Sequence, residues 1–177
     1  MKVTIYGIGG TGTSTLCKSI ANKYDIYYGY TGQIFRDIAN SLGLSIYEFE
    51  NLQKEKPEYD KKVDEEVKQF GIDNDNFIFE GRLAWYFIPD SIKIKLECSE
   101  RERGRRIAER EGISIDDAMK KTKDREEGLV HRYKLVYPNL NYPPCNSQFD
   151  FILDTSNLDT NQVLEKVVEF LDKKISN

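Results

Sequence analysis

A glycine-rich loop near the amino terminus constrains the fold of this chain more than any other feature. Four glycines lie within six residues, from Gly7 to Gly12, and they follow the short β-type run 3–6, Val-Thr-Ile-Tyr. Hydroxyl-bearing residues then begin a helical stretch at Thr13. Glycines let successive backbone N–H groups turn toward one point, and a helix N-terminus adds the positive end of its dipole. The sequence therefore predicts a strand, a loop and a helix that together cradle a phosphate group.

The spacing of this loop favours one nucleotide-binding motif over another. Gly7 and Gly12 have the G-x-x-x-x-G spacing of a Walker A loop (P-loop), and Ser14 occupies its Mg²⁺-binding hydroxyl position. Thr13 stands where that motif has lysine. The glycines also fit G-x-G-x-x-G, but a dinucleotide site needs a carboxylate about 20 residues further on, and the run 28–32 contains none. A P-loop is therefore favoured over a dinucleotide site and over a glycine turn without a ligand.

The composition limits the classes of protein and partner. The 177 residues, 39% hydrophobic and 32% charged, are typical of one globular domain. Because the formal net charge is −4, nucleic acid is not an expected partner, and a phosphate site must gather positive charge locally. No apolar stretch approaches the roughly 20 residues of a membrane helix, and no signal peptide precedes the first strand. We therefore expect a cytoplasmic protein without a membrane partner.

The cysteines do not form a metal or disulfide pattern. Cys17, Cys98 and Cys145 are far apart, without a CxxC pair, and His131 is the single histidine. An odd, scattered set predicts structural thiols rather than a zinc site, a redox pair or a disulfide framework.

Short β-type runs alternate with helical stretches, which is the pattern of an α/β protein with a parallel sheet. Four of the five runs are almost continuously apolar, as is typical of strands covered on both faces. The predicted strands are Val3–Tyr6, Ile26–Tyr28, Phe77–Glu80, Ile92–Glu97 and Phe151–Asp154. No repeat, low-complexity tract or linker divides the chain, so residues 1–177 are expected to form a single domain.

Capping residues, glycine and proline mark the helix boundaries. N-cap spacing predicts helix starts at Ser45 with Glu48, Ser99 with Glu102, Ser114 with Asp117, and Asp159. Pro57 is expected to open a helix, and Gly71 is expected to end it. Two long helical stretches within residues 99–138 meet at Gly112, where we expect the hinge of a flap.

Polar residues after the second and third predicted strands can complete a phosphate site. Thr31 follows the second strand and can cap a helix, which places Arg36 one turn further on, facing the strand ends. Glu80 ends the third strand, where a carboxylate can hold Mg²⁺ through water. Arg82 enters the same crevice, and its planar guanidinium suits a phosphate group.

Four segments of the chain form a pattern that is more specific than any one of them. They are Gly-Ile-Gly-Gly-Thr-Gly-Thr-Ser-Thr at 7–15, Thr-Gly-Gln-Ile-Phe-Arg at 31–36, Glu-Gly-Arg-Leu-Ala-Trp at 80–85, and Arg-Glu-Glu with Arg-Tyr within 125–133. In this order, and over nearly the whole chain, they resemble nucleoside monophosphate kinases, most closely the cytidylate kinases of archaeal type. A Gly-Thr-Gly-Thr loop without the usual lysine is common in that group, so Thr13 agrees with the resemblance.

The resemblance implies a P-loop fold of three layers, α/β/α, around a five-stranded parallel sheet. It also implies two helical additions at the carboxyl ends of the strands. One is a segment that binds the acceptor nucleoside monophosphate, at about residues 31–70. The other is a lid, at about residues 99–136.

The resemblance further assigns roles to single residues. Thr31, Arg36 and Arg82 would bind the acceptor nucleotide. Ser14, together with Glu80 through water, would hold Mg²⁺. ATP would contact the loop after the last strand, and it would be bound by Gly7, Ile8, Gly9, Gly10, Thr11, Gly12, Thr13, Ser14, Thr15, Arg103 and Arg106.

The predicted lid carries many arginines interleaved with acidic residues, and most of these should form ion pairs on a solvated helix. Arg103 and Arg106 align with lid arginines of the cytidylate kinases. Arg125 and Arg132 are seven residues apart, so a helix places them on one face, where they can stabilise charge on a transferred phosphoryl group. Leu129 departs from bacterial cytidylate kinases, which have an acidic base-reading residue at this spacing; the base specificity therefore stays open.

The resulting hypothesis is a nucleoside monophosphate kinase that converts ATP·Mg²⁺ and CMP to ADP and CDP. Arg36 and Arg82 hold the acceptor phosphate, while Arg82, Arg125 and Arg132 act in catalysis. No general base is required, because the acceptor oxygen is already an anion. The size suits a monomer, with a dimer as the alternative. Two other functions stay open: a kinase for AMP, UMP, dCMP or a non-nucleotide alcohol, and a P-loop protein that binds nucleotide without efficient catalysis.

Overall fold

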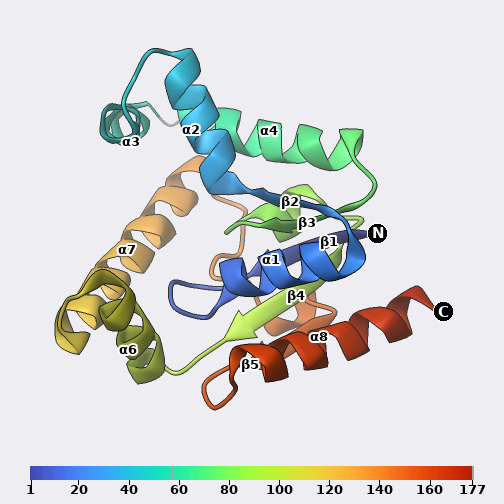
Figure 1. Ribbon diagram of the computed structural model, residues 1–177. Coiled ribbons are helices and arrows are strands. Elements are labelled where there is room, and N and C mark those ends of the chain that lie inside the picture. Colours follow the sequence, from blue (N-terminus) through green and yellow to red (C-terminus); the bar gives the residue numbers. More distant parts are fainter. Residues whose placement is uncertain (57, 177) are drawn as a thin grey trace.

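The computed structural model describes residues 1–56 and 58–176, and it contains the predicted parallel sheet (Figure 1). The strand order is β2-β3-β1-β4-β5, and all four neighbouring pairs are parallel. The strands are β1 (Lys2–Tyr6), β2 (Tyr27–Tyr30), β3 (Phe77–Glu80), β4 (Ile92–Glu97) and β5 (Phe151–Asp154). β1 is therefore central, and the glycine loop leaves the middle of the sheet.

Helices cover both faces of the sheet, which confirms the three-layer α/β/α architecture (Figure 1). On one face lie α1 (Thr13–Tyr24) and α8 (Thr160–Ile175), whose buried residues share one core cluster with the central strands. On the other face lie α4 (Glu58–Asp73) and α5 (Ala84–Phe87), which pack on the phenylalanines of β3. Each large apolar side chain buried in this way contributes about 1.5–3 kcal/mol.

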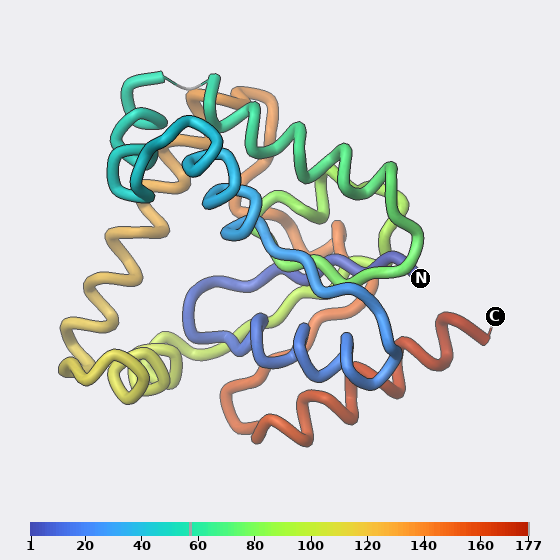
Figure 2. The backbone as a smooth tube through the Cα atoms, turned by 45° about the horizontal axis from the view of Figure 1, so that its top comes forward, coloured from blue at the N-terminus to red at the C-terminus, as the bar shows by residue number. Residues whose placement is uncertain are grey.

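The remaining helices lie beyond the carboxyl ends of the strands. α2 (Thr31–Ser41) and α3 (Ile46–Glu55) continue from β2, whereas α6 (Glu100–Glu111) and α7 (Ile115–Val136) continue from β4. Figure 2 shows α7 as a long bridge that starts beside α6 and ends near α2–α4. A 3₁₀ turn, Asn146–Gln148, precedes β5. No helix within the described ranges is long and apolar enough to cross a membrane.

Most of the predicted helix boundaries are confirmed. Ser45, Ser99, Ser114 and Asp159 all cap helices, each accepting a hydrogen bond from a backbone N–H of the first turn. Gly112 ends α6 with φ 68°, in the left-handed region that favours glycine, and α7 begins three residues later. The structure therefore places a break between the two long helices where the sequence predicts it.

Three boundary predictions are wrong. The second strand begins at Tyr27, because Asp25 turns the chain and the Ile26 N–H donates to Ala21 O at the end of α1. α4 continues past Gly71 to Asp73; this glycine allows close packing, since a Cβ there would lie 2.8 Å from Ile88 Cγ1. Thr31 does not cap α2 but is its first residue. The prediction for Pro57 lies outside the described residues.

The cap of α8 gives a test of how the fold is stabilised. Asp159 accepts hydrogen bonds from the N–H groups of Asn161 and Gln162, both at 2.9 Å. We expect Asp159→Ala to lower the free energy of unfolding by about 1 kcal/mol, measured by urea denaturation, because these N–H groups lose their partner. Asp159→Asn keeps an acceptor oxygen and should retain most of that stability. Equal losses in the two variants would contradict the capping role.

Candidate active site

The glycine loop forms a tight turn that leaves the N-terminus of α1 open. The backbone N–H and the hydroxyl of Thr11 both donate to Ile8 O, at 3.2 and 2.8 Å. Gly12 holds the N-cap position of α1 with φ 96°, and it has no side chain that could cap the helix. The first N–H groups of α1 are therefore left for an external acceptor, which is the arrangement that binds phosphate in other helices.

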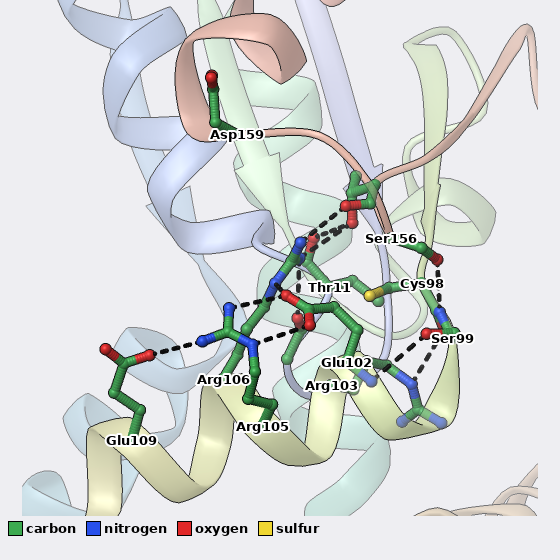
Figure 3. Close-up of polar contacts among 12 residues, drawn as sticks. Thr11, Cys98, Ser99, Glu102, Arg103, Arg105, Arg106, Glu109, Ser156 and Asp159 are labelled. Carbon is green, nitrogen blue, oxygen red and sulfur yellow. Dashed lines mark hydrogen bonds and ion pairs between the residues drawn. The ribbon is translucent and has the colours of Figure 1, made fainter.

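Helix α6 lies directly on this loop, and one of its arginines hydrogen-bonds to the loop. Arg106 donates to Thr155 O at 2.7 Å, to Thr155 Oγ1 at 3.1 Å and to Gly10 O at 3.4 Å. Thr155 Oγ1 lies 3.1 Å from Thr11 O, so the segment after β5 is tied to the same loop. Figure 3 shows Arg106 directed toward the Thr11 region, with Glu102 beside it. Arg106 thus joins α6, the glycine loop and the segment after β5.

Arg103 is placed differently from Arg106. Its Nε donates to Cys98 O at 3.2 Å (Figure 3). Its side chain lines a separate hollow of about 590 Å³ between α6 and α7. Arg105 stays on the exposed side of α6 and pairs with Glu102 and Glu109. Hydrogen bonds from Arg105, and then from Arg106, lower the pKa of Glu102 to about 2. Of the two predicted ATP-binding arginines, only Arg106 lies at the cavity beside the loop.

Ser14 and Glu80 meet at the edge of the loop. The strand register sets Glu80 beside Ile5 of β1, and Ser14 Oγ donates to Glu80 Oε1 at 2.8 Å. Tyr28 donates to the same oxygen at 2.9 Å, while Glu80 Oε2 is buried without a hydrogen-bond partner among the described residues. A carboxylate and a hydroxyl are the oxygen donors that Mg²⁺ takes alongside phosphate and water. The residues present therefore fit a magnesium ion.

One large cavity connects the glycine loop with the helices beyond it. Its volume is about 1160 Å³, above the roughly 300–1,000 Å³ that is typical of a pocket for one small ligand. Loop residues 7–15, except Thr11, line one end, and α2, α3 and α4 line the other. Six arginines face it although the chain is acidic overall: Arg36, Arg82, Arg106, Arg110, Arg125 and Arg132. The cavity has room for two ligands and positive charge for two sets of phosphates.

Arg36 and Arg82 are held by neighbours at the acceptor side and centre of this cavity. Arg36 donates to Tyr30 OH at 2.6 Å, and its guanidinium lies 5.2 Å from the centre of that ring. Arg82 donates to the carbonyl oxygen of Gly7 and forms an ion pair with Glu126 of α7. Thr31 lies beside them, with its hydroxyl 3.5 Å from Glu80 O. Arg82 therefore links the glycine loop to α7.

Arg125 and Arg132 of α7 both line the cavity, as their spacing predicts, but their surroundings differ. Arg132 is half-buried, and its Nε lies 3.4 Å from Asp60 Oδ1. Arg125 is exposed, and no residue in the described part of the chain pairs with it. Arg125 is thus the cavity arginine with the most freedom to follow a ligand.

With this geometry in place, comparison with known proteins identifies the family. Residues 3–128 match the family described as an AAA domain. The cytidylate kinase of Methanocaldococcus jannaschii is 34% identical over 177 residues, which cover 97% of this chain and 98% of that protein. The cytidylate kinase of Pyrococcus abyssi is 36% identical over 156 residues, covering 87% and 84%. This chain belongs to the archaeal-type cytidylate kinase family. It is therefore an ATP-dependent phosphotransferase of the nucleoside monophosphate kinase class.

Solved structures agree with this kinase in fold. A shikimate kinase from Aquifex aeolicus superposes with a TM-score of 0.65 at 14% identity, covering 99% of this chain and 98% of that chain. An uncharacterized protein from Eubacterium ventriosum gives a TM-score of 0.71 at 15% identity, covering 97% and 98%. At these identities the likeness establishes the three-layer P-loop fold alone.

The kinase also has a buried polar cluster that the sequence analysis missed. Gln53 of α3 and Asp60 and Asp64 of α4 line the end of the cavity formed by α2, α3 and α4, and each is less than one tenth exposed. The signal was present: the two aspartates are four residues apart on the helix face that carries Val63 and Val67. Charged residues on an apolar face indicate a buried polar site.

Burial shifts the ionisation of this cluster. Burial raises the pKa of Asp64 to about 7, although the hydrogen bond from Tyr137 OH at 2.7 Å acts in the opposite direction. Burial also raises the pKa of Asp60, with the charge of Arg132 opposing it. Asp64 is therefore protonated in much of the folded protein near neutral pH.

The shifted pKa of Asp64 predicts a pH dependence of stability. Because the folded pKa of about 7 exceeds the ordinary value of 3.8 for an aspartate, the folded state binds more protons than the unfolded state between these pH values. The contribution of Asp64 to the free energy of unfolding is thus full below pH 4, falls as the pH rises to about 7, and is at most about 4 kcal/mol. Asp64→Asn should remove this dependence. The free energy of unfolding of the variant should therefore increase relative to that of the wild type as the pH rises from 4 to 7.

Urea denaturation at several pH values measures this difference. The exposed Asp37→Asn serves as the matched control, and its stability should follow the wild type in parallel. An Asp64→Asn curve that also runs parallel to the wild type from pH 4 to pH 7 would contradict the shifted pKa.

Proposed function

We propose that this kinase transfers the γ-phosphoryl group of ATP to CMP, giving ADP and CDP. The observation that carries the proposal is the single cavity in which the glycine loop, the Ser14–Glu80 pair and six arginines meet. Further support comes from the relatives in Pyrococcus abyssi and Methanocaldococcus jannaschii, which are both named cytidylate kinases. Residues 31–70 serve as the acceptor-binding segment and residues 99–136 as the lid.

The donor phosphates lie in the glycine loop in this proposal. The N–H groups of loop residues 7–15 and the open end of α1 donate to phosphate oxygens, and the α1 dipole adds partial positive charge. Arg106, which already touches Gly10 O and Thr155, orients the loop and lies close enough to contact the donor. Arg103 reaches the donor only if α6 moves, because its side chain faces the other hollow.

Ser14 and Glu80 are the residues that would hold magnesium, Glu80 through water. Bound there, the ion would neutralise charge on the donor phosphates. Tyr28 fixes Glu80 Oε1 with a hydrogen bond of 2.9 Å, and burial followed by the charge of Glu80 raises the pKa of this phenol, so it stays a donor. Ser14 and Tyr28 together therefore orient the carboxylate.

The acceptor phosphate lies between Arg36 and Arg82, with Thr31 at the side. Phosphoryl transfer needs positioning and charge stabilisation, and the acceptor phosphate oxygen attacks without a base. Arg125 and Arg132 approach the transferred group as the lid turns about Gly112, and closure removes water that would otherwise hydrolyse ATP. Arg82 takes part because it connects the loop carbonyl of Gly7 with Glu126 of the lid.

A second function in the same class is transfer to another small acceptor, since Leu129 replaces the acidic residue of bacterial relatives. A coupled assay of ADP release separates the two functions. If CMP is the acceptor, turnover of CMP and dCMP should exceed that of UMP and AMP, and a higher kcat/KM for UMP or AMP than for CMP would reject CMP. ADP release with none of the four nucleotides would reject all of them as acceptors and favour a non-nucleotide acceptor or a protein that binds nucleotide without efficient catalysis.

The lid arginine Arg125 gives a test of catalysis. Arg125→Gln should lower kcat by about 10²–10³-fold, because transition-state arginines in phosphoryl transfer typically contribute this much or more. Its KM for ATP should change far less, since Arg125 forms no side-chain hydrogen bond or ion pair with the described residues. Steady-state kinetics measure both values.

Arg101→Gln is the matched control, because Arg101 is exposed on α6 and does not line the cavity. It should keep kcat within about threefold of the wild type. Equal kcat values for the two variants would contradict a catalytic role for Arg125.

A further inference from the structure

Two oxygens of the buried cluster, one on Gln53 and one on Asp60, receive no hydrogen bond from the described residues. Gln53 is 3% exposed and Asp60 is 4% exposed, and Gln53 Nε2 donates to Asp60 Oδ1 at 3.1 Å. Gln53 Oε1 and Asp60 Oδ2 are shielded from solvent, yet neither has a hydrogen-bond partner among the described residues. An unpaired buried polar atom is unfavourable, so two such oxygens on neighbouring residues that line the cavity indicate a ligand that supplies donors.

The orientation of the Gln53 amide is fixed by its neighbour. Rotation of the amide by 180° would bring Gln53 Oε1 against the Asp60 Oδ1 oxygen, which cannot donate when ionised. The free atom of Gln53 is therefore its oxygen. Arg132 approaches Asp60 on the Oδ1 side, at 3.4 Å, and so does not satisfy Asp60 Oδ2.

The surroundings of these two oxygens suit a flat aromatic ring. Apolar side chains line the same cavity beside the polar cluster: Phe35, Val67, Leu83, Ala84, Leu129 and Val136. Pockets of this kind combine apolar walls with a few polar atoms that select the ligand. Arg36 and Arg82 lie in the same cavity, so a base in this position has its phosphate within reach of guanidinium groups.

We propose that Gln53 Oε1 and Asp60 Oδ2 accept hydrogen bonds from the exocyclic amino group of the acceptor base. The inference deepens the proposed function and rests on it. The amino group of cytosine carries two hydrogens, one for each oxygen. Uracil has a carbonyl oxygen in the same place, which would face two acceptors and leave all three atoms unpaired. Gln53 and Asp60 thus take the role that Leu129 cannot perform, and they select an amino-bearing base over uracil.

The test compares CMP with UMP in the full-length protein. The wild type should prefer CMP over UMP by at least about 10²-fold in kcat/KM, because sites built to hydrogen-bond a substrate group strongly reject an analogue without it. Asp60→Asn preserves the shape but can turn an amide N–H₂ toward the base, which suits the carbonyl of uracil. It should reduce the CMP/UMP ratio by at least about tenfold, with UMP gaining in absolute terms.

A second variant distinguishes base recognition from an effect of Asp60→Asn on folding or on the ion pair with Arg132. Gln53→Met removes the amide at similar volume and leaves the ion pair of Asp60 intact. It should also lower the CMP/UMP ratio about tenfold, through a higher KM for CMP, and titration calorimetry should show weaker CMP binding. Gln69→Met, an exposed glutamine of α4 outside the cavity, is the matched control and should keep the wild-type ratio.

The outcomes separate this inference from the proposed function. A lower kcat for both acceptors at an unchanged ratio would assign Gln53 and Asp60 a structural role and overturn the inference, while CMP turnover by the wild type would still support the kinase. A wild type that prefers UMP would overturn the inference as well. Loss of CMP preference in both variants, with the Gln69→Met ratio unchanged, is the supporting result.

Discussion

Phosphate binding without a loop lysine is the constraint on which the arrangement of this kinase depends. A Walker A lysine places a full positive charge inside the loop, whereas Thr13 offers a hydroxyl, and the α1 dipole adds roughly half a charge. The missing charge lies across the cavity, on arginines from the helices around it, in a chain whose net charge is −4. In the free protein, most of these guanidinium groups already contact a protein side chain. Arg36 donates a hydrogen bond to Tyr30, and three others form ion pairs: Arg82 with Glu126, Arg106 with Glu102 and Arg132 with Asp60.

The same contacts connect the lid to the rest of the molecule. Arg82 bridges the loop carbonyl of Gly7 to Glu126 of α7, and Arg106 bridges α6 to Thr155 after β5. A phosphate group that binds one of these arginines competes with the protein oxygen that holds it. Under the proposed function, ligand binding and the position of α6 and α7 would therefore be linked equilibria, because the ligand would favour whichever helix position frees the guanidinium.

Local sequence signals accounted for the sheet, the glycine loop and four helix caps, since each depends on residues close in the chain. Long-range packing decided the rest. Gly71 lies inside α4 because Ile88 packs against it, and Arg103 turns away from the loop toward Cys98 O. The Gln53–Asp60 pair depends on how α3 meets α4, and its unpaired oxygens become apparent only in the folded structure. The positions of the arginines in the sequence predicted most of those that line the cavity. They did not predict the protein group that each arginine contacts.

A double-mutant cycle between Thr13 and Arg125 tests most directly whether charge from the lid replaces the loop lysine. Thr13→Lys is introduced into the wild type and into Arg125→Gln, and kcat is measured for all four proteins with CMP and ATP. If the two charges serve the same phosphates, Thr13→Lys should raise kcat of the Arg125→Gln protein at least about tenfold while changing the wild type by less than about threefold. The same factor in both backgrounds would show that the sites act independently and would contradict the account.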